Sequence, residues 1–436
     1  MDTPAAPTTQ PSARTVYLLF TTLDYTKKTV GVDEMIAFTN NTGVTLNNIV
    51  LAVESNYWQD CFALESFNVD GAAASYHLNG HRFEIELPTP LDPGKATTIS
   101  IKYNLNLPWK DISNIFGYNN SQINLTNWYP FVVPFQNGDW VLHDLMPFGE
   151  ELVYDASDFE VDLKTVNPDA GVTIAASAPA ESNGDWTRYK LFNARTIVLS
   201  ASPYFQVTSQ TVNGVTINSY YFSGHEKAGA AMLQNASDAL NVYGSVYTPY
   251  AQPSLSVVET NYLDGMEYDG LVFLAQNFYN NYDGTPKNDL TMIGVHEIAH
   301  QWWFASVGND QALEPWLDET LATYSEHIFY EKTYPNDVNW WWHYRVNYYN
   351  PSGYVDTTIY NGGSFRPYTN AVYLNGANFI DELRIRIGED DFFAFLKDYA
   401  AQMAGRISSK ADFMRILSQH TSVDYSDIIA SYFQNP

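Results

Sequence analysis

The sequence predicts a multi-domain protein, in which an N-terminal all-β saddle or sandwich precedes an α/β domain that is mainly helical in its C-terminal half. The chain has 436 residues, which is too long for one ordinary hydrophobic core. Up to about residue 205, short runs of β-branched and aromatic residues alternate with turn signals. From about residue 225 onward, apolar residues recur with helical spacing.

The expected strands of the first domain are Thr15–Thr21, Val32–Thr39, Asn48–Glu54, Arg82–Leu87, Thr97–Leu105, Glu160–Leu163 and Thr196–Ser200. Turns between them are marked by Asp70-Gly71, Asn79-Gly80 and Asn137-Gly138. This spacing is typical of a β-sandwich or saddle. One more hairpin, Gln206–Val212 with Gly214–Phe222, precedes the change of pattern. We therefore expect a disordered leader over 1–14, a β-domain over 15–210 and a second domain over 211–436.

The second domain is expected to begin with a helix at Lys227–Tyr243 and strands at Leu255–Glu259 and Leu271–Leu274. Asp289 can cap a long helix from Leu290 to Val307, which Gly308 closes. Pro315 opens the next helix, from Trp316 to Lys332. The remaining expected helices are Asn336–Asn350, Gly376–Ile387, Asp390–Met403 and Lys410–Gln419.

Charge and composition exclude several classes of protein. The 22 basic and 49 acidic residues give a formal net charge of −27, which argues against nucleic acid and anionic membranes as partners. No apolar run reaches roughly 18 residues, so no transmembrane segment is expected. The single cysteine, Cys61, has apolar neighbours and is expected to be buried. The Pro-, Thr- and Ala-rich leader is typical of sequence that follows an export signal. An extracellular or cell-envelope location is therefore expected, with the cytoplasm as the alternative.

The strongest motif is His296-Glu297-Ile298-Ala299-His300. On a helix, positions i and i+4 share a face, so both imidazoles can bind one metal ion, and Glu297 can act on a metal-activated water. A catalytic zinc ion takes three protein ligands, so one more is needed. Glu319, separated from the second histidine by residues 301–318, can supply it from the next helix, with Asp318 as the alternative.

Other residues near the motif have weaker assignments. Glu326, one heptad after Glu319, is expected either to accept a hydrogen bond from a ligating imidazole or to lie on a solvated helix face. The remaining histidines lack paired ligand spacing and are expected to be structural or exposed: His77, His81, His143, His225, His327, His343 and His420.

Two further stretches complete a resemblance to the aminopeptidase N / leukotriene A4 hydrolase family of gluzincin zinc metallopeptidases. Residues 296–303 and 314–319 resemble the family's zinc signature with its spacer. Gly265-Met266-Glu267-Tyr268 resembles the exopeptidase motif Gly-x-Met-Glu-Asn, with Tyr268 replacing asparagine and Asp264 replacing the usual glycine. Residues 372–377, which include Tyr373, resemble the Tyr-x-Lys-Gly-Ala stretch, with Asn375 replacing lysine.

The resemblance implies a β-saddle domain followed by a thermolysin-like catalytic domain, in a minimal form without the helical domain of many members. It implies one Zn²⁺ per chain, with the ligands His296, His300 and Glu319. Glu297 is then the general base, and Tyr373 stabilises the oxyanion. Substrate binding falls to the motif Gly265, Met266 and Glu267, where Glu267 holds the free α-ammonium of the peptide.

These implications predict a zinc-dependent aminopeptidase that acts on peptides with a free N-terminus. A zinc endopeptidase is an open alternative, because the helical domain that closes the cavity in the family is missing. A secreted binding protein with an idle zinc site is another, although the intact Glu297 and Tyr373 argue against it. Asn119, Asn120 and Gln122 are expected where the family's first domain often lends a polar side chain to the substrate amine, with an ordinary loop as the alternative.

Overall fold

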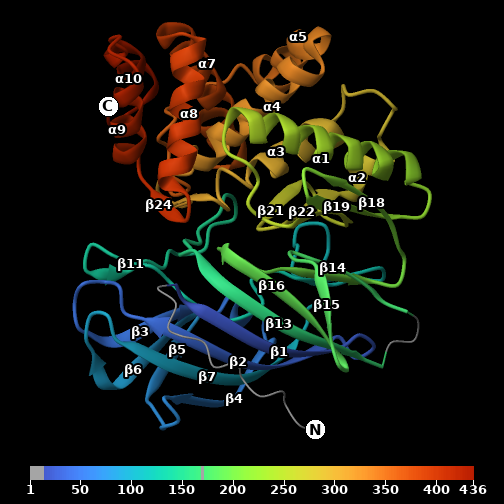
Figure 1. Cartoon of the computed structure of the whole chain (residues 1–436), viewed down its shortest axis with the longest axis vertical. Coiled ribbons are helices and arrows are strands. Elements are labelled where there is room, and N and C mark those ends of the chain that lie inside the picture. Colours follow the sequence, from blue (N-terminus) through green and yellow to red (C-terminus); the bar gives the residue numbers. More distant parts are fainter. Residues whose placement is uncertain (1–13, 168–170) are drawn as a thin grey trace.

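The computed structural model describes residues 14–167 and 171–436, which form two domains stacked on each other (Figure 1). The β-rich N-terminal half lies below in this view, and the helices of the C-terminal half lie above. The predicted fold class is confirmed. The expected leader lies outside the described residues, apart from Arg14. Within the described ranges, no helix is long and apolar enough to cross a membrane.

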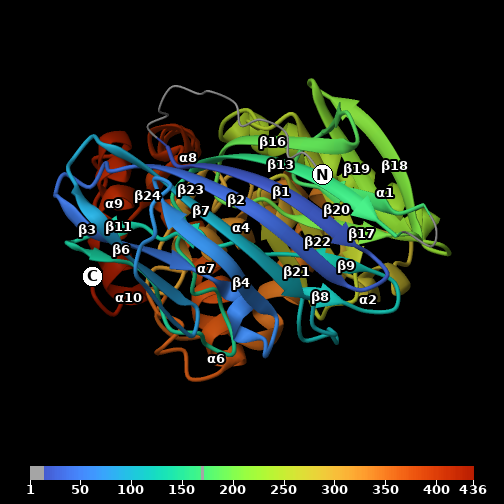
Figure 2. The ribbon, with the colours of Figure 1, turned by 90° about the horizontal axis from the view of Figure 1, so that it is seen from below.

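The first domain is built around a seven-stranded sheet. In spatial order its strands are β15 (Ala180–Asn183), β16 (Trp186–Ala194), β13 (Ser157–Val166), β1 (Val16–Asp24), β2 (Thr29–Thr39), β7 (Ala96–Asn106) and β4 (Phe62–Val69). All neighbours are antiparallel except β1 and β13, which run parallel. Figure 2 shows the longer of these strands side by side across the underside of the molecule. Buried residues alternate along β1 and β2, as the period of two predicts.

Three smaller sheets complete this domain. One contains β10 (Phe131–Val132), β3 (Leu46–Ala52), β6 (Arg82–Leu91) and β5 (Tyr76–Asn79). Another contains β14 (Thr173–Ala176), β17 (Leu199–Ser202), β9 (Ile123–Leu125) and β8 (Gly117–Tyr118). The third is the hairpin of β11 (Phe135–Gln136) and β12 (Asp139–Trp140). A single hydrophobic cluster joins residues of the large and small sheets, and Cys61 is buried within it as expected.

The second domain starts with a five-stranded mixed sheet. Its strands are, in order, β18 (Phe205–Val212), β19 (Val215–Phe222), β20 (Ser254–Thr260), β22 (Leu271–Ala275) and β21 (Gly265–Tyr268). The boundary expected after residue 210 falls inside β18, because the chain changes sheets between β17 and β18. Helices α1 (Glu226–Val246) and α3 (Asp289–Ala299) lie on the side of this sheet away from the first domain (Figure 1).

The remaining helices are α2 (Gln276–Asn280), α4 (Trp316–Thr333), α5 (Val338–Trp341), α6 (Phe365–Thr369), α7 (Gly376–Ile387), α8 (Glu389–Met403), α9 (Lys410–His420) and α10 (Ser426–Tyr432). Short 3₁₀ turns lie at Glu54–Tyr57, Pro335–Asp337 and Asn347–Tyr349, and π-helical turns lie at Trp342–Val346 and Asn370–Asn375. A parallel pair of short strands, β23 (Val307–Asn309) and β24 (Arg406–Ser408), completes the domain.

Two of the expected helices are wrong in extent. Helix α3 ends at Ala299 rather than Val307, because the chain turns after His300 and continues into β23. Its N-cap is Asn288 rather than Asp289, since the Asn288 side chain accepts a hydrogen bond from the backbone N–H of Thr291 at 2.9 Å. The expected helix over 336–350 is broken into two 3₁₀ turns, α5 and a π-helical turn.

A buried arginine docks the two domains. The Arg195 guanidinium donates to backbone carbonyl oxygens of both domains, those of Tyr154, Phe304, Ser306 and Arg406. Gly308 leaves room for it, because a Cβ there would lie 2.6 Å from Nη1 of Arg195. The Asp269 carboxylate, in the turn between β21 and β22, accepts from the backbone N–H groups of Arg195 and Thr196, both at 3.0 Å. These bonds fix the edge of the five-stranded sheet against the first domain.

Candidate active site

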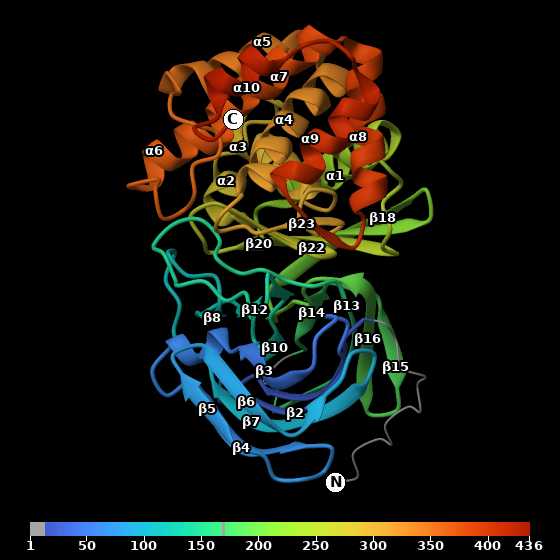
Figure 3. The same cartoon turned by 90° about the vertical axis from the view of Figure 1, so that its left-hand side faces the viewer.

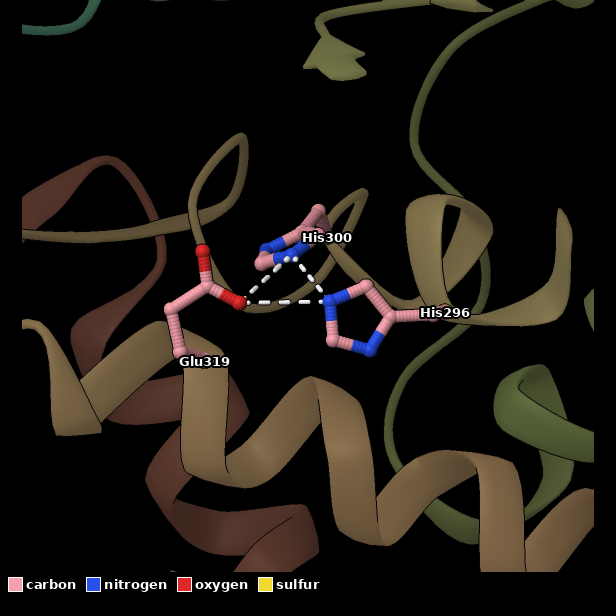
Figure 4. A group of neighbouring side chains, drawn as sticks. All are labelled: His296, His300 and Glu319. Carbon is pink, nitrogen blue, oxygen red and sulfur yellow. Dashed lines mark hydrogen bonds and ion pairs between the residues drawn. The ribbon is translucent and has the colours of Figure 1, made fainter. Parts of the chain in front are cut away.

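Helices α3 and α4 bring together three side chains that could bind one metal ion (Figure 4). His296 and His300 lie one turn apart at the end of α3, with their Nε2 atoms 3.1 Å apart. Glu319, in the first turn of α4, places Oε2 3.2 Å from Nε2 of His296 and 3.5 Å from Nε2 of His300. Asp318 is not in this group; one of its oxygens accepts from the backbone N–H of Glu319. Among the described residues, no other histidine belongs to a group of possible metal ligands.

The donor set fits zinc. Tetrahedral Zn²⁺ with N and O ligands at about 2.0–2.2 Å has ligand atoms about 3.3 Å apart, close to the three measured separations. Both imidazoles present Nε2 to the centre because Nδ1 is engaged elsewhere. Nδ1 of His296 lies 2.8 Å from Oε1 of Glu326, and Nδ1 of His300 lies 2.8 Å from the carbonyl oxygen of Trp303. When Nδ1 donates, the Nε2 lone pair is free for a metal.

Two alternatives were expected for Glu326, and the structure shows the first of them, a hydrogen bond to an imidazole of the cluster. The fully buried Glu326 carboxylate also accepts from Nε1 of Trp341 at 2.8 Å and from Nη2 of Arg345 at 2.9 Å. Burial alone would raise the pKa of Glu326, but Arg345 and His296 outweigh burial and lower it. Glu326 is therefore an ionised acceptor that fixes the orientation of the His296 ring.

Glu297 lies beside the metal cluster. Its carboxylate, that of Glu267 and a ring nitrogen of His300 all lie within 4.8 Å of one another. Gly265 on β21 provides the space, because a Cβ there would lie 2.5 Å from Cδ of Glu297. Burial raises the pKa of Glu297 well above its usual range, and the two histidines oppose this. A carboxylate with a raised pKa is suited to taking up a proton and returning it.

Strand β21 divides the exopeptidase motif between two faces. Gly265 and Glu267 face α3, whereas Met266 packs against the hydrophobic cluster that joins the two domains and also lines the cleft. Glu267 is only 3% exposed, and its Oε1 accepts from Nε2 of Gln311 at 3.3 Å. Burial raises the pKa of Glu267, the charge of His300 lowers it, and that of Glu319 raises it.

Gln301 fastens this strand to the end of α3. Its Nε2 donates to the carbonyl oxygen of Tyr268 at 2.9 Å, and its Oε1 accepts from the backbone N–H of Gly270 at 2.9 Å. The residue after the second histidine of the motif therefore sets the position of Glu267 relative to the metal ligands.

Tyr373 lies on the π-helical turn Asn370–Asn375, a distortion that is frequent at functional sites. Its ring stacks on that of His296, with centroids 6.0 Å apart. Burial, and then the Glu319 charge, raise the pKa of Tyr373 well above its usual range, so the hydroxyl stays protonated and can donate. Gly376 allows α7 to approach α4, because a Cβ there would lie 2.8 Å from Cγ2 of Thr320.

Glu150 of the first domain also reaches the site, although no motif pointed to it. It lies on the irregular segment between β12 and β13, lines the cleft, and has a buried Oε2 without a hydrogen-bond partner among the described residues. Burial raises the pKa of Glu150, and the charges of Glu319 and Glu267 raise it further. A buried carboxylate beside other carboxylates is suited to holding a cationic group.

The polar side chains expected at this position lie elsewhere. Asn119, Asn120 and Gln122 do not line the cleft. Nε2 of Gln122 donates instead to Oγ of Ser200 and to the carbonyl oxygen of Glu259, which places it in the interface between the domains. Several first-domain residues line the cleft instead, and Glu150 is the one among them whose pKa is raised by the charges of Glu319 and Glu267.

The site opens into a cleft of about 1100 Å³ lined by both domains. Glu150, Glu267 and Glu297 all have raised pKa values, mainly because they are buried. Glu319 differs, because His300 and His296 outweigh burial and lower its pKa. The cleft therefore places an ionised metal-binding carboxylate beside carboxylates that bind protons more readily.

Sequence comparisons agree with this geometry. Residues 231–432 match the peptidase family M1 domain. Aminopeptidase M1-B of Oryza sativa subsp. japonica is 22% identical over 241 residues, covering 52% of this chain and 28% of that relative. Aminopeptidase N of Lactobacillus delbrueckii subsp. lactis is 27% identical over 185 residues, covering 40% and 21%. The chain thus spans about a quarter of the length of these curated relatives.

Solved structures share the two-domain fold. A mutant of the M1 zinc metallopeptidase from Deinococcus radiodurans has a TM-score of 0.72 at 16% identity, covering 97% of this chain and 94% of that one. The mutant with a bound Tyr-Ser-Ala substrate has a TM-score of 0.68 at 17% identity, with the same coverage. A two-domain M1 zinc metallopeptidase mutant bound to L-arginine has a TM-score of 0.66 at 17% identity, covering 96% and 93%.

Two histidines and a glutamate on successive helices, with a second glutamate after the first histidine, have the arrangement of a gluzincin-type zinc site. The match of residues 231–432 to the peptidase family M1 domain and the shared two-domain fold confirm the resemblance noted in the sequence.

Proposed function

We propose that this chain is a zinc-dependent aminopeptidase that hydrolyses the N-terminal bond of peptides, with one Zn²⁺ held by His296, His300 and Glu319. One observation carries the exopeptidase assignment. The buried Glu267 carboxylate lies in one group with Glu297 and His300, where it can hold a substrate amine one residue away from the bond to be cut. The Tyr-Ser-Ala and L-arginine complexes of the structural relatives support peptides as substrates.

The residues of the site divide the chemistry among them. Zinc, when bound, supplies a Lewis acid that activates water and polarises the scissile carbonyl. Glu297 takes a proton from the attacking water and returns it to the leaving amine, a role supported by its raised pKa. Tyr373 donates its phenolic proton in a hydrogen bond to the oxygen on which negative charge develops. Glu267 and Glu150 bind the α-ammonium from opposite sides of the domain interface.

The first test replaces Glu297 by Gln. The variant keeps the size of the side chain but cannot accept a proton, so kcat should fall at least about 100-fold, while zinc content stays near that of the unmodified protein. Elemental analysis and a fluorogenic aminoacyl substrate measure the two quantities. A metal-replete variant with ordinary rates would contradict the assignment of Glu297.

A substrate panel tests the exopeptidase assignment. Free aminoacyl substrates should be cut, their N-acetylated counterparts should resist, and a chelator should abolish the activity. Acetylation removes the positive charge that Glu267 and Glu150 are proposed to bind. Equal cleavage of both series would exclude an aminopeptidase.

A zinc endopeptidase is the second candidate, favoured by the size of the cleft. Pockets for small ligands measure about 300–1000 Å³, and this cleft slightly exceeds them. Internal cleavage of a peptide blocked at its N-terminus, detected by mass spectrometry, would select this candidate.

A further inference from the structure

One irregular segment of the first domain crosses to the second domain and carries Glu150. We call residues 141–155, which contain neither helix nor strand, the strap. In Figure 3 the blue-green chain that leaves β12 rises from the first domain toward the helices above. The strap lines the cleft from residue 145 to residue 154 with few interruptions, so its position determines where the Glu150 carboxylate lies.

The base of the strap is tied to the second domain by a histidine–aspartate pair. Nε2 of His143 lies 2.9 Å from Oδ2 of Asp310, and both side chains are largely buried. Beside this pair, the Tyr360 hydroxyl donates to the carbonyl oxygen of Asp144 at 3.0 Å. Two side-chain contacts therefore fasten adjacent residues of the strap to the catalytic domain.

Asp310 is itself held in a defined position. Its Oδ1 accepts from the backbone N–H of Leu313 at 3.0 Å, and its carbonyl oxygen accepts from the backbone N–H of Glu314 at 2.7 Å. The next residue, Gln311, donates to Glu267. The His143–Asp310 pair thus joins the loop that supports Glu267 to the strap that carries Glu150.

The tip of the strap packs against a second segment. The rings of Phe148 and Tyr368 have centroids 5.4 Å apart. Gly149 lies so close to Ile359 that a Cβ would lie within 3.4 Å of two of its carbon atoms. These contacts limit lateral movement of Glu150 but supply no bond that opposes its electrostatic repulsion from Glu267 and Glu319.

A tie at the base of the strap can oppose that repulsion. The charges of Glu319, Glu267 and Asp318 act on Glu150 and raise its pKa, and the charge of His300 opposes them. Without a substrate amine between them, like charges on these carboxylates favour a strap that moves outward. A bond at the base of the strap keeps the carboxylates in place before the substrate arrives, so less binding energy is lost in ordering them.

We propose that His143 and Asp310 are positioning residues that hold Glu150 opposite Glu267, so that both carboxylates can bind the substrate's amine. The proposal rests on the aminopeptidase function proposed above and adds to it a role for the domain interface in substrate recognition. Neither residue touches the substrate. Both act through the position of the strap.

Steady-state kinetics of the full-length, zinc-loaded protein test this role. His143→Ala should raise KM for free-amine substrates about 10-fold, because a hydrogen bond involving a charged group is lost, while kcat changes less than about 3-fold and zinc content is unchanged. His143→Gln should restore most of the affinity, since Nε2 of glutamine can reach Asp310 in place of Nε2 of histidine. An unchanged KM in His143→Ala, or a fall in kcat alone, overturns the proposal.

A matched control exists within the second domain. His420 makes the same kind of bond, with Nε2 2.9 Å from Oδ2 of Asp398, and neither residue lines the cleft. His420→Ala should leave both KM and kcat within about twofold of the unmodified protein. If His420→Ala raises KM as much as His143→Ala does, the effect is general loss of stability, and the positioning role is wrong.

A double-mutant cycle shows whether His143 acts through Glu150. The KM of His143→Ala combined with Glu150→Gln should be no higher than that of Glu150→Gln alone, because the tie has no carboxylate left to position. If the increases in KM caused by the two substitutions multiply in the double variant, the proposal is overturned.

If the unmodified protein cuts no free-amine peptide, the proposed function itself fails. If it does cut them and His143→Ala is unaffected, only the positioning role fails.

Discussion

The two halves of the proposed catalytic centre are built in different ways. The metal half lies within one domain, on two helices that follow each other in the chain, and Glu326 on α4 orients a ligand on α3. The amine half draws Glu267 from β21, Gln311 from a loop and Glu150 from the other domain. Helical spacing therefore determines the first half, whereas the second depends on how the two domains dock.

The largest effect is expected in the metal half. Glu319→Ala removes a ligand and should leave little zinc after dialysis, because two imidazoles alone bind zinc far more weakly than three ligands do. Glu326→Ala removes only the partner of His296 and should weaken zinc affinity about 10–100-fold. Elemental analysis and competition with a chelator measure both.

Glu331 provides the control on the same helix. It pairs with Arg384 and does not line the cleft. Glu331→Gln should retain zinc. Loss of zinc from this variant would show that α4 is simply sensitive to substitution, and the assignment of Glu319 would lose its support.

The amine half should respond differently. Glu267→Gln should raise KM for free-amine substrates about 10–100-fold, because one charge-assisted bond to the ammonium is lost, while zinc content stays the same. Glu150→Gln should have a smaller effect of the same kind. Both effects are measured by KM and by the ratio of the cleavage rates of free and N-acetylated substrates. Zinc loss in either variant would contradict the division into two halves.

The same division explains what could be predicted from the sequence. His296 and His300 followed from helical spacing, and Glu319 followed from its place early in the next helix, with Asp318 as the alternative. These predictions require only that α3 and α4 form and pack side by side. Glu150 lies in a segment without periodicity, and its carboxylate reaches the site only after the domains dock. A local pattern carries no information about such a contact. In the sequence, only the neighbouring Gly149 hints that Glu150 lies in a tightly packed place, and this is a weak indication of a site residue.

The end of α3 illustrates the limit within one element. The run from Trp302 to Val307 is apolar except for Ser306, and that pattern is compatible with a continuing helix. In the structure the run is buried as a turn that leads into β23, where Phe304 has a φ of 143°, a backbone conformation that is rare for residues with a side chain. Arg195 of the first domain bonds to the Phe304 carbonyl oxygen. The helix end is therefore set partly by a residue more than a hundred positions away.

Gly265→Ala tests a contact between the halves, with a moderate expected effect. The added methyl group would overlap Cδ of Glu297, so the general base must shift while Glu267 and the zinc ligands remain. We expect kcat to fall about 10–100-fold, with KM and zinc content changed little. A fall in zinc content, or an equal loss through KM, would show that the strand as a whole has moved.

The smallest effect is expected at the domain interface, where Asp269 docks the strand that carries Glu267. Burial raises its pKa to about 6, although Arg195 and several hydrogen bonds oppose this. Between about pH 4 and pH 6 the unfolded chain loses this proton while the folded protein keeps it, so Asp269 lowers stability as the pH rises through this window.

The substitution Asp269→Asn removes this titration. The melting temperature of the variant minus that of the unmodified protein should therefore increase by about 2–4 °C from pH 4 to pH 6.5. Other groups titrate in both proteins and cancel in the difference, so two parallel curves would show that the docking contact is not sensitive to pH in this range.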